Sequence, residues 1–120
     1  MIPKFRAYNP ATNNWYNSED VFVCDGKIYL DDDDFEGLTQ NNDVKLMQST
    51  GVLDKNGKEI FEGDVVNIFD EKLSKIYYSE GAFCVDVLNG GTPLHVYLSE
   101  HLELIGNIYE NPELVEGING

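Results

Sequence analysis

The sequence predicts a mainly β protein: a small SH3-like barrel or sandwich with an amino-terminal β-meander and a short C-terminal helical turn. Three observations support this fold class. Short segments rich in β-branched and aromatic residues recur about every ten residues. Glycine or asparagine stands at most of the corners between these segments. No segment with helical periodicity is long enough to organise a bundle of helices.

The clearest element in the first half of the chain is a hairpin at residues 21–30. Its Asp25-Gly26 corner lies between two runs of β-branched and aromatic residues, which is the strongest short-range hairpin signal. The other elements expected here are strands at 4–8 and 15–16 around a turn at 9–14, an acidic loop at 31–37, a loop or short helical turn at 38–43, and a strand at 44–50.

The second half begins with a tight turn predicted at Asn56-Gly57, because this dipeptide suits the positive φ angles of a short hairpin loop. Glu62-Gly63-Asp64 then leads into an apolar strand. The expected elements are strands at 58–61, 65–69, 74–78, 82–88, 95–99 and 103–108, turns at 70–72, 80–81 and 89–93, and a helical turn at 113–116 that follows Asn111-Pro112.

The length of 120 residues is typical of one domain, and we predict a single domain over residues 1–120. A subdivision into a β-meander at 1–50 and an SH3-like barrel at 51–120 is the alternative. Each of these parts is small for a core of its own, so we expect one shared hydrophobic core.

The charge is strongly acidic, with 22 Asp and Glu against 8 Lys and Arg, which gives a net charge of −14. A chain of this charge repels nucleic-acid phosphates, so direct binding to nucleic acid is not expected. The charge favours solubility first. Attraction of a basic partner and imitation of a phosphate array are the other interpretations.

The sequence contains no apolar run of the length that spans a membrane, and its amino terminus lacks the apolar segment of a signal peptide. We therefore expect a cytoplasmic protein. The two cysteines, Cys24 and Cys84, lie within apolar strand patterns. In such a compartment they are expected to be buried free thiols.

Two groups of residues invite a metal interpretation. The first is the acidic run Asp31, Asp32, Asp33 and Asp34, which with Glu36, Gly37 and Asp43 resembles the spacing of a calcium-binding loop. The match is poor, because the fifth and twelfth ligands are of the wrong type and strands flank the loop. A solvated acidic loop is the favoured interpretation, and calcium binding is the alternative.

The second group is the pair His95 and His101. In one extended strand the two imidazoles would share a face but lie about 20 Å apart, too far for one metal ion. Only a bend between them could bring them together, so we expect ordinary surface or half-buried histidines. We predict no metal site.

The sequence shows none of the common patterns for a nucleophilic serine or cysteine, and it has no glycine pattern for cradling phosphate. Many pairs of carboxylates are present, but nothing distinguishes one pair from the others. We therefore expect no catalytic residues, no cofactor and no enzymatic activity.

Three segments carry a resemblance to a known family. Residues 5–8 (Phe-Arg-Ala-Tyr), residues 46–66 (the central signature, LMQSTGVLDKNGKEIFEGDVV) and residues 105–114 (the closing signature, IGNIYENPEL) resemble the YopX family, small proteins encoded by bacteriophages and prophages. Tyr8 in place of Trp and Val52 in place of Leu are conservative departures. The resemblance implies a mainly β, intracellular, phage-associated protein, and it brings no established activity or catalytic residues with it.

These observations together predict a non-catalytic binding or assembly module, encoded by a phage or prophage and located in the cytoplasm of the bacterial host. Its expected partner is a protein or a second copy of the chain, and neither nucleic acid nor membrane. One alternative is an acidic decoy of a host nucleic-acid-binding protein. Another is a metal-dependent enzyme that uses the run of aspartates with His95 or His101.

Overall fold

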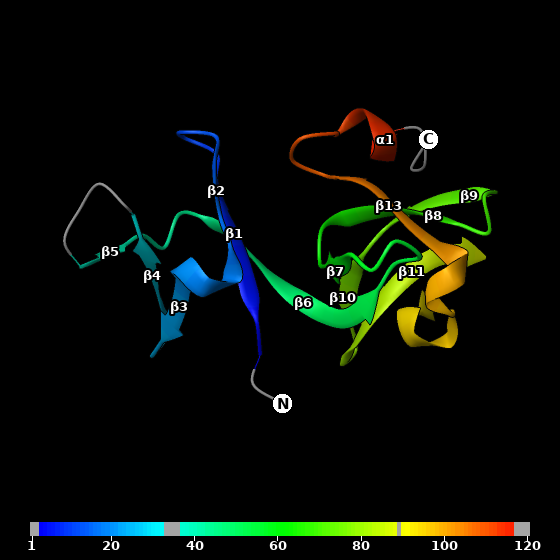
Figure 1. The fold of residues 1–120 in the computed structure, drawn as a ribbon, viewed down its shortest axis with the longest axis horizontal. Helices are drawn as coiled ribbons and strands as arrows, with labels where there is room; N and C mark the ends of the chain where they lie inside the picture. Colours follow the sequence, from blue (N-terminus) through cyan, green and yellow to red (C-terminus); the bar gives the residue numbers. More distant parts are fainter. Residues whose placement is uncertain (1–2, 33–36, 89, 117–120) are drawn as a thin grey trace. The chain divides into compact units, whose positions relative to one another are not determined.

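The computed structural model describes residues 3–32, 37–88 and 90–116 (Figure 1). The chain divides into two compact units, which are described separately: unit 1 is Met1–Ser49 and unit 2 is Thr50–Gly120. Every strand pair that the structure describes is antiparallel. The predicted mainly β fold class is confirmed, and so is the short C-terminal helix, α1 (Glu113–Glu116).

Unit 1 contains two groups of paired strands. Strand β1 lies between β2 and the first part of β6, and β4 lies between β3 and β5. The elements are β1 (Phe5–Asn9), β2 (Asn14–Tyr16), the 3-10 turn η1 (Ser18–Asp20), β3 (Val21–Cys24), β4 (Lys27–Asp31), β5 (Leu38–Gln40) and β6 (Lys45–Leu53), which continues into unit 2.

The hairpin predicted at residues 21–30 is present as β3 and β4. Asp25 and Gly26 both have positive φ angles, of 54° and 76°. Two positive φ angles in a two-residue loop define the type I′ turn, whose twist matches that of the flanking strands. The register pairs Cys24 with Lys27 directly across the turn.

The opening signature of the chain is explained by contacts within unit 1. The Arg6 guanidinium lies 5.0 Å from the ring centroid of Trp15, and its Nη2 donates to Met47 Sδ at 3.6 Å. Tyr8 stacks on the same Trp15, with ring centroids 4.7 Å apart, and its hydroxyl donates to Asn13 Oδ1 at 2.7 Å. The arginine and the aromatic residue of this signature therefore hold β1, β2 and β6 together.

Unit 2 is built from two three-stranded antiparallel sheets, with strand orders β13-β8-β9 and β10-β11-β12, and β7 follows β6 in strand order. The elements are β7 (Glu59–Phe61), β8 (Asp64–Ile68), β9 (Lys72–Lys75), β10 (Tyr77–Ser79), β11 (Ala82–Leu88), β12 (Gly90–Pro93), the 3-10 turns η2 (Leu94–Val96) and η3 (Ser99–His101), β13 (Leu102–Asn107) and α1.

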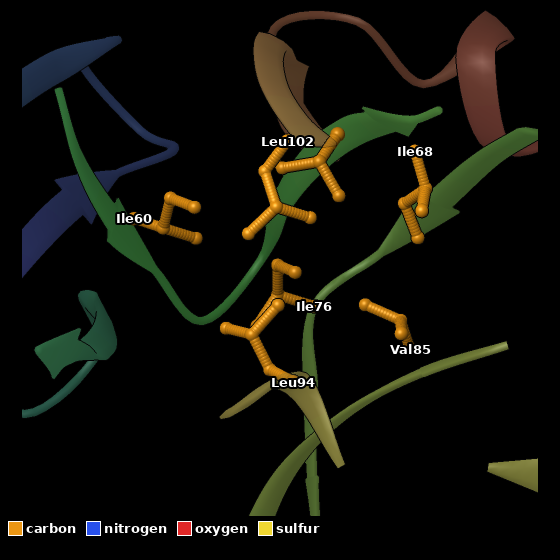
Figure 2. Close-up of a cluster of buried hydrophobic side chains, with 7 residues drawn as sticks. Ile60, Ile68, Ile76, Val85, Leu94 and Leu102 are labelled. Carbon is orange, nitrogen blue, oxygen red and sulfur yellow. The ribbon is translucent and has the colours of Figure 1, made fainter. Parts of the chain in front are cut away.

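Aliphatic side chains from most elements of unit 2 converge in one cluster (Figure 2). Its fully buried members are Ile60, Val66, Ile68, Ile76, Val85, Leu94 and Leu102. Burial of branched aliphatic chains of this size contributes about 1.5–3 kcal/mol each and is the main force that closes the unit.

Unit 1 has a separate buried cluster, formed by Ala7, Val21, Leu30 and Val44. The expectation of one shared core was therefore wrong among the described residues. Two aromatic side chains extend the smaller cluster, since Phe5 and Tyr16 pack against it from β1 and β2.

The strand predicted at 74–78 is divided between β9 and β10, which belong to different sheets, with Ile76 between them. Three further segments differ from their predicted conformation. Residues 38–40 form strand β5 where a loop or helical turn was expected, because Leu38, Thr39 and Gln40 pair with β4. Residues 95–99 do not form a strand. The chain there makes two 3-10 turns, closed by Tyr97 N donating to Leu94 O at 3.1 Å and His101 N donating to Leu98 O at 2.9 Å.

The third difference is the glycine-rich segment at residues 89–93, predicted as a turn, whose described part is strand β12. The absence of a side chain at Gly91 lets the backbone of β12 approach Tyr77 closely. A Cβ at Gly91 would overlap the Tyr77 hydroxyl, which donates to Asp86 Oδ1 at 2.6 Å. That hydrogen bond, with burial and the Asp86 charge as further causes, raises the pKa of Tyr77 to about 12.

Both cysteines are free thiols in the structure. Cys84 is buried, as expected, but Cys24 is exposed. The apolar residues around Cys24 suggested a buried strand. In the structure β3 lies at the edge of the sheet β3-β4-β5, and Cys24 is exposed there.

Candidate binding site

The polar residues of the central signature stabilise the fold. Asp54 is only 2% exposed, and its Oδ1 accepts backbone N–H groups from Asn56 and Lys58, each at 2.9 Å. Its Oδ2 accepts the N–H of Leu104 at 2.9 Å. One carboxylate therefore organises the loop after β6 and ties it to β13.

The pKa of Asp54 reflects the same contacts. Burial alone raises it, but the hydrogen bonds from Leu104, Lys58 and Asn56, together with the charge of Lys58, outweigh burial and bring the pKa below its usual value. Hydrogen bonds to the charged form of a carboxyl group always act in this direction.

The prediction of a tight two-residue turn at Asn56-Gly57 was wrong, because the chain forms a longer loop there. Of these two residues only Gly57 has a positive φ, of 80°, and the connection from β6 to β7 covers residues 54–58. The sequence pattern did not show that Asp54 would fold back on its own loop and lengthen it.

Other signature residues also have structural roles. Thr50 Oγ1 donates to Ile60 O at 2.7 Å and accepts the N–H of Val52 at 3.0 Å. Asp64 Oδ2 accepts the N–H of Phe61 at 2.8 Å across the turn that leads into β8. These bonds hold the middle and the last residue of β7.

The closing signature folds around one asparagine. Asn107 Oδ1 accepts the N–H groups of Tyr109 at 3.0 Å and Glu110 at 2.8 Å. Gly106 is required because a Cβ there would overlap the Asn111 carboxamide, whose Oδ1 accepts the N–H of Asn107 at 3.3 Å. Both signatures are thus explained by architecture, and the candidate site lies largely outside them.

A hollow of about 180 Å³ opens on unit 2. We call it the β8–η3 hollow, because most of its lining comes from the β8–β9 hairpin and the segment from η3 into β13. The residues that line it are Lys55, Asn67, Phe69, Asp70, Glu100, His101, Leu102 and Glu103.

Asn67, which lines the hollow, has a side-chain oxygen with an unusual environment. Its side-chain Oδ1 is buried, and no described residue donates a hydrogen bond to it. An unpaired buried acceptor costs about 1–3 kcal/mol, so native structures hold few of them. The oxygen is closed to solvent in this structure, so a bound partner reaches it only after the Asn67 carboxamide turns toward the hollow.

Phe69 provides the second unusual feature. It has a φ of +56°, a conformation that costs a bulky residue about 1–2 kcal/mol. Its N–H donates to His101 O at 2.9 Å, and its ring lies 4.4 Å from the His101 ring and 5.9 Å from the Tyr97 ring. The backbone is held in this conformation while the ring stays 50% exposed.

The charges around the hollow are predominantly negative. Lys55 Nζ is paired with Glu103 Oε2 at 3.3 Å, and His101 Nε2 lies 3.6 Å from Glu100 Oε1. Asp70 adds an exposed carboxylate at the tip of the hairpin. The single lysine is therefore offset by its partner, and the other two carboxylates leave the lining acidic.

The segment that contacts Phe69 also carries exposed apolar side chains. Tyr97, which packs edge-on against the Phe69 ring, is flanked in sequence by Val96 and Leu98. These two side chains are 57% and 61% exposed, the most exposed large apolar groups of the described residues. They belong to the gold coil between β12 and β13 in Figure 1.

The residues considered for a metal site do not come together in the described part of the chain. Asp31 is exposed at the end of β4, and Asp32 Oδ1 accepts the hydroxyl of Tyr16 at 2.9 Å. Asp33, Asp34 and Glu36 lie outside the described residues. No group of three or more His, Cys, Asp or Glu that could hold an ion occurs among residues 3–32, 37–88 and 90–116.

The two histidines have different surroundings. His101 lines the β8–η3 hollow, whereas His95 lines a separate hollow with Val52, Phe83 and Leu94. The extended strand assumed for both is replaced by the turns η2 and η3.

Sequence reasoning missed Asn67 and Phe69 as site residues. Both fall in the segment predicted as a strand at 65–69, where Phe69 looks like another core aromatic. The only available signal was the adjoining Asp70, a residue type common in turns.

In the part of the chain that the structure describes, no helix is long and apolar enough to cross a membrane.

Comparison with known proteins gives one family. The model of the YopX protein family matches residues 4–116. The crystal structure of protein EF1440 from Enterococcus faecalis is similar, with a TM-score of 0.71 and 28% identity over 96% of this chain and 99% of that one. Protein YopX from Bacillus subtilis has a similar fold, with a TM-score of 0.66 and 22% identity over 92% and 96% of the two chains. No curated protein matches.

Proposed function

This chain belongs to the YopX family, and we propose that it is a non-catalytic binding module that receives a basic side chain of a protein partner in the β8–η3 hollow. The family is one of unknown function, so membership alone assigns no activity. The observation that carries the proposal is the buried, unpaired Oδ1 of Asn67 in a hollow with acidic residues and an exposed aromatic ring.

The chemistry of the hollow suits an arginine or a lysine. A guanidinium or ammonium group carries only donors, and it would supply the N–H that Asn67 Oδ1 lacks once the Asn67 carboxamide turns to present that buried oxygen to the hollow. The exposed ring of Phe69 attracts a cation through its π face, with an energy of about 0.5–2 kcal/mol. Carboxylates at Glu100 and Asp70 add long-range attraction that speeds the encounter.

The apolar surface beside the hollow supports a protein partner over a small ion. Val96 and Leu98 are suited to contact aliphatic neighbours of the basic residue. A centre of apolar and aromatic groups with a polar rim is the usual anatomy of a protein interface. The positive φ of Phe69 fits the tendency of binding sites to hold strained residues.

Direct binding tests the proposal. A fluorescent peptide with one arginine between two leucines is compared with the same peptide carrying citrulline, which keeps the shape and removes the charge. We expect the arginine peptide to bind at least about tenfold more tightly, and its affinity to fall with added salt. Equal affinity of the two peptides would refute a site for a basic side chain.

Variants locate the site. Phe69→Asn keeps a residue type that tolerates positive φ but removes the ring, and Leu98→Lys places a positive charge beside the hollow. Both are expected to abolish binding of the arginine peptide. Tyr78→Lys is the matched control, because Tyr78 is a similarly exposed aromatic residue on β10 that does not line the hollow.

The finer statements about biology stay predictions. They are phage or prophage origin, location in the bacterial cytoplasm, a homo-oligomeric state and the absence of catalysis. Affinity capture from cells that express the chain, with Leu98→Lys as the negative control, would identify the partner and address its compartment at the same time.

A further inference from the structure

Going beyond the proposed function, we infer that the outer edge of β3 in unit 1 docks an extended segment of a protein partner. The segment adds a fourth strand to the sheet β3-β4-β5 and carries basic residues at its ends. Addition of a strand to an exposed sheet edge is a common mode of peptide recognition, in which main-chain hydrogen bonds supply much of the affinity.

The residues of β3 leave this edge unprotected. Its sequence, Val-Phe-Val-Cys, contains no charge and no proline, the devices by which proteins usually block an edge strand. Phe22 and Val23 are 44% and 42% exposed, and Cys24 is exposed as well. Such an edge is a template for pairing with another strand.

The backbone N–H and C=O groups of Val23 face the outer edge of the sheet. Its cross-strand partner is Ile28, whose N–H donates to Asn42 Oδ1 and whose C=O accepts the N–H of Asn41, both at 2.9 Å. The peptide groups of Ile28 therefore face away from β3. In an antiparallel pair the two opposed residues behave alike, so the N–H and C=O of Val23 face the outer edge.

The backbone hydrogen bonds differ between the two sides of the β3-β4 hairpin. On the far side of β4, strand β5 and the Asn41-Asn42 segment bond to the backbone. On the near side, no described residue bonds to the outward backbone groups of Val23. The contrast makes the β3 edge the place where the sheet can be extended.

Charge decides between a second copy and a different partner. Exposed acidic residues flank the edge at both ends, Glu19 before β3 and Asp25 after it. Antiparallel pairing of two β3 strands would place Asp25 of each copy near Glu19 of the other, and like charges opposite one another destabilise a pair. A partner strand with lysine or arginine at its ends would gain from the same geometry.

The test uses the full chain and two capped peptides observed by NMR through the backbone amides. One peptide alternates threonine and valine between terminal lysines, and the other has the same centre between terminal glutamates. We expect saturable shifts at Phe22, Val23 and Cys24 with the lysine peptide. The glutamate peptide should need an about tenfold higher concentration for the same shifts.

Two variants at one position provide the control. Val23→Pro removes the outward N–H and leaves the bonds between β3 and β4 in place, because Val23 does not bond to Ile28. Val23→Thr keeps the N–H and changes the side chain by a similar amount. Binding should be lost in the proline variant and kept in the threonine variant. In both variants the other backbone amide signals should keep the positions of the folded protein.

Three outcomes would overturn the inference. The first is the absence of shifts in β3 with the lysine peptide, and the second is undiminished binding by Val23→Pro. The third is a concentration-dependent dimer in which the Val23 amide is protected, since that would make a second copy the occupant. None of these outcomes involves the β8–η3 hollow, so this inference and the proposed function fail separately.

Discussion

Asp54 and Asn67 are two polar side chains of unit 2 that approach neighbouring residues of β13 and behave in opposite ways. Asp54 accepts the N–H of Leu104, and Asn67 pairs across strands with Glu103. The buried carboxylate of Asp54 accepts three backbone N–H groups in all, whereas the buried Oδ1 of Asn67 has no donor among the described residues.

The difference separates a residue that completes the fold from one that we propose to bind a partner. A buried polar group whose hydrogen bonds are complete stabilises the fold, and its loss leaves partners unpaired. A buried polar group without a partner costs stability and is kept where something else benefits from it. Asp54 lies within the central signature, and Asn67 lies just after it.

The largest expected effect tests the structural side of the comparison. Asp54→Ala leaves the N–H groups of Asn56, Lys58 and Leu104 without their acceptor, so we expect a loss of about 3 kcal/mol or more in the free energy of unfolding. Urea denaturation measures this loss. Glu71→Ala, which removes an exposed carboxylate in the same unit, should change stability by no more than about 0.5 kcal/mol.

A smaller effect is expected at the closing signature. Gly106→Ala pushes a methyl group into the Asn111 carboxamide and the Leu114 side chain, and should cost about 1–3 kcal/mol. Because Asn111→Ala removes the obstacle, the double variant should cost less than the sum of the two single changes. Strictly additive losses would show that Asn111 is not the reason for the glycine.

The pH dependence of stability sharpens the comparison further. The pKa of Asp54 is lower in the folded than in the unfolded state, so its contribution is complete above the unfolded value of about 4 and is lost as the pH falls through the folded value. The stability difference between the wild type and Asp54→Asn should therefore shrink in acid. A difference that is constant with pH would mean that the carboxylate charge is unimportant.

The smallest stability effect is expected at Asn67. Asn67→Leu removes an unpaired acceptor and keeps the volume, so stability should change by less than about 1 kcal/mol or increase slightly. Binding of the arginine peptide should nevertheless weaken about tenfold. A loss of stability as large as that of Asp54→Ala would erase the distinction between the two residues.

Local signals predicted much of the fold. The Asp25-Gly26 hairpin, the turn at Glu80-Gly81, strand β11 and helix α1 follow from turn residues and short apolar runs, and all are present. Two of the errors have a common cause. Gly91 and Leu38 were interpreted by their local preference, and pairing with a neighbouring strand determined their conformation instead.

The site was harder to predict than the fold. Phe69 was expected to end a strand, but it shares a positive φ with Asp70 in a turn closed by Glu71 N donating to Ile68 O. Its own N–H is bonded to His101, more than thirty residues later in the chain. The lack of a donor for Asn67 is a property of its surroundings, which no sequence pattern reports. His101 was considered for a metal and is instead one wall of the hollow.

By itself, the sequence determined where the chain turns, which segments are strands, and that the surface is acidic, because these properties depend on nearest neighbours and composition. The tertiary structure alone decided that the apolar residues divide between two buried clusters, that Asp54 is fully hydrogen-bonded, and that the Asn67 oxygen is buried without a donor. Those outcomes depend on contacts between residues far apart in the chain, whose geometry is fixed only when the strands pack.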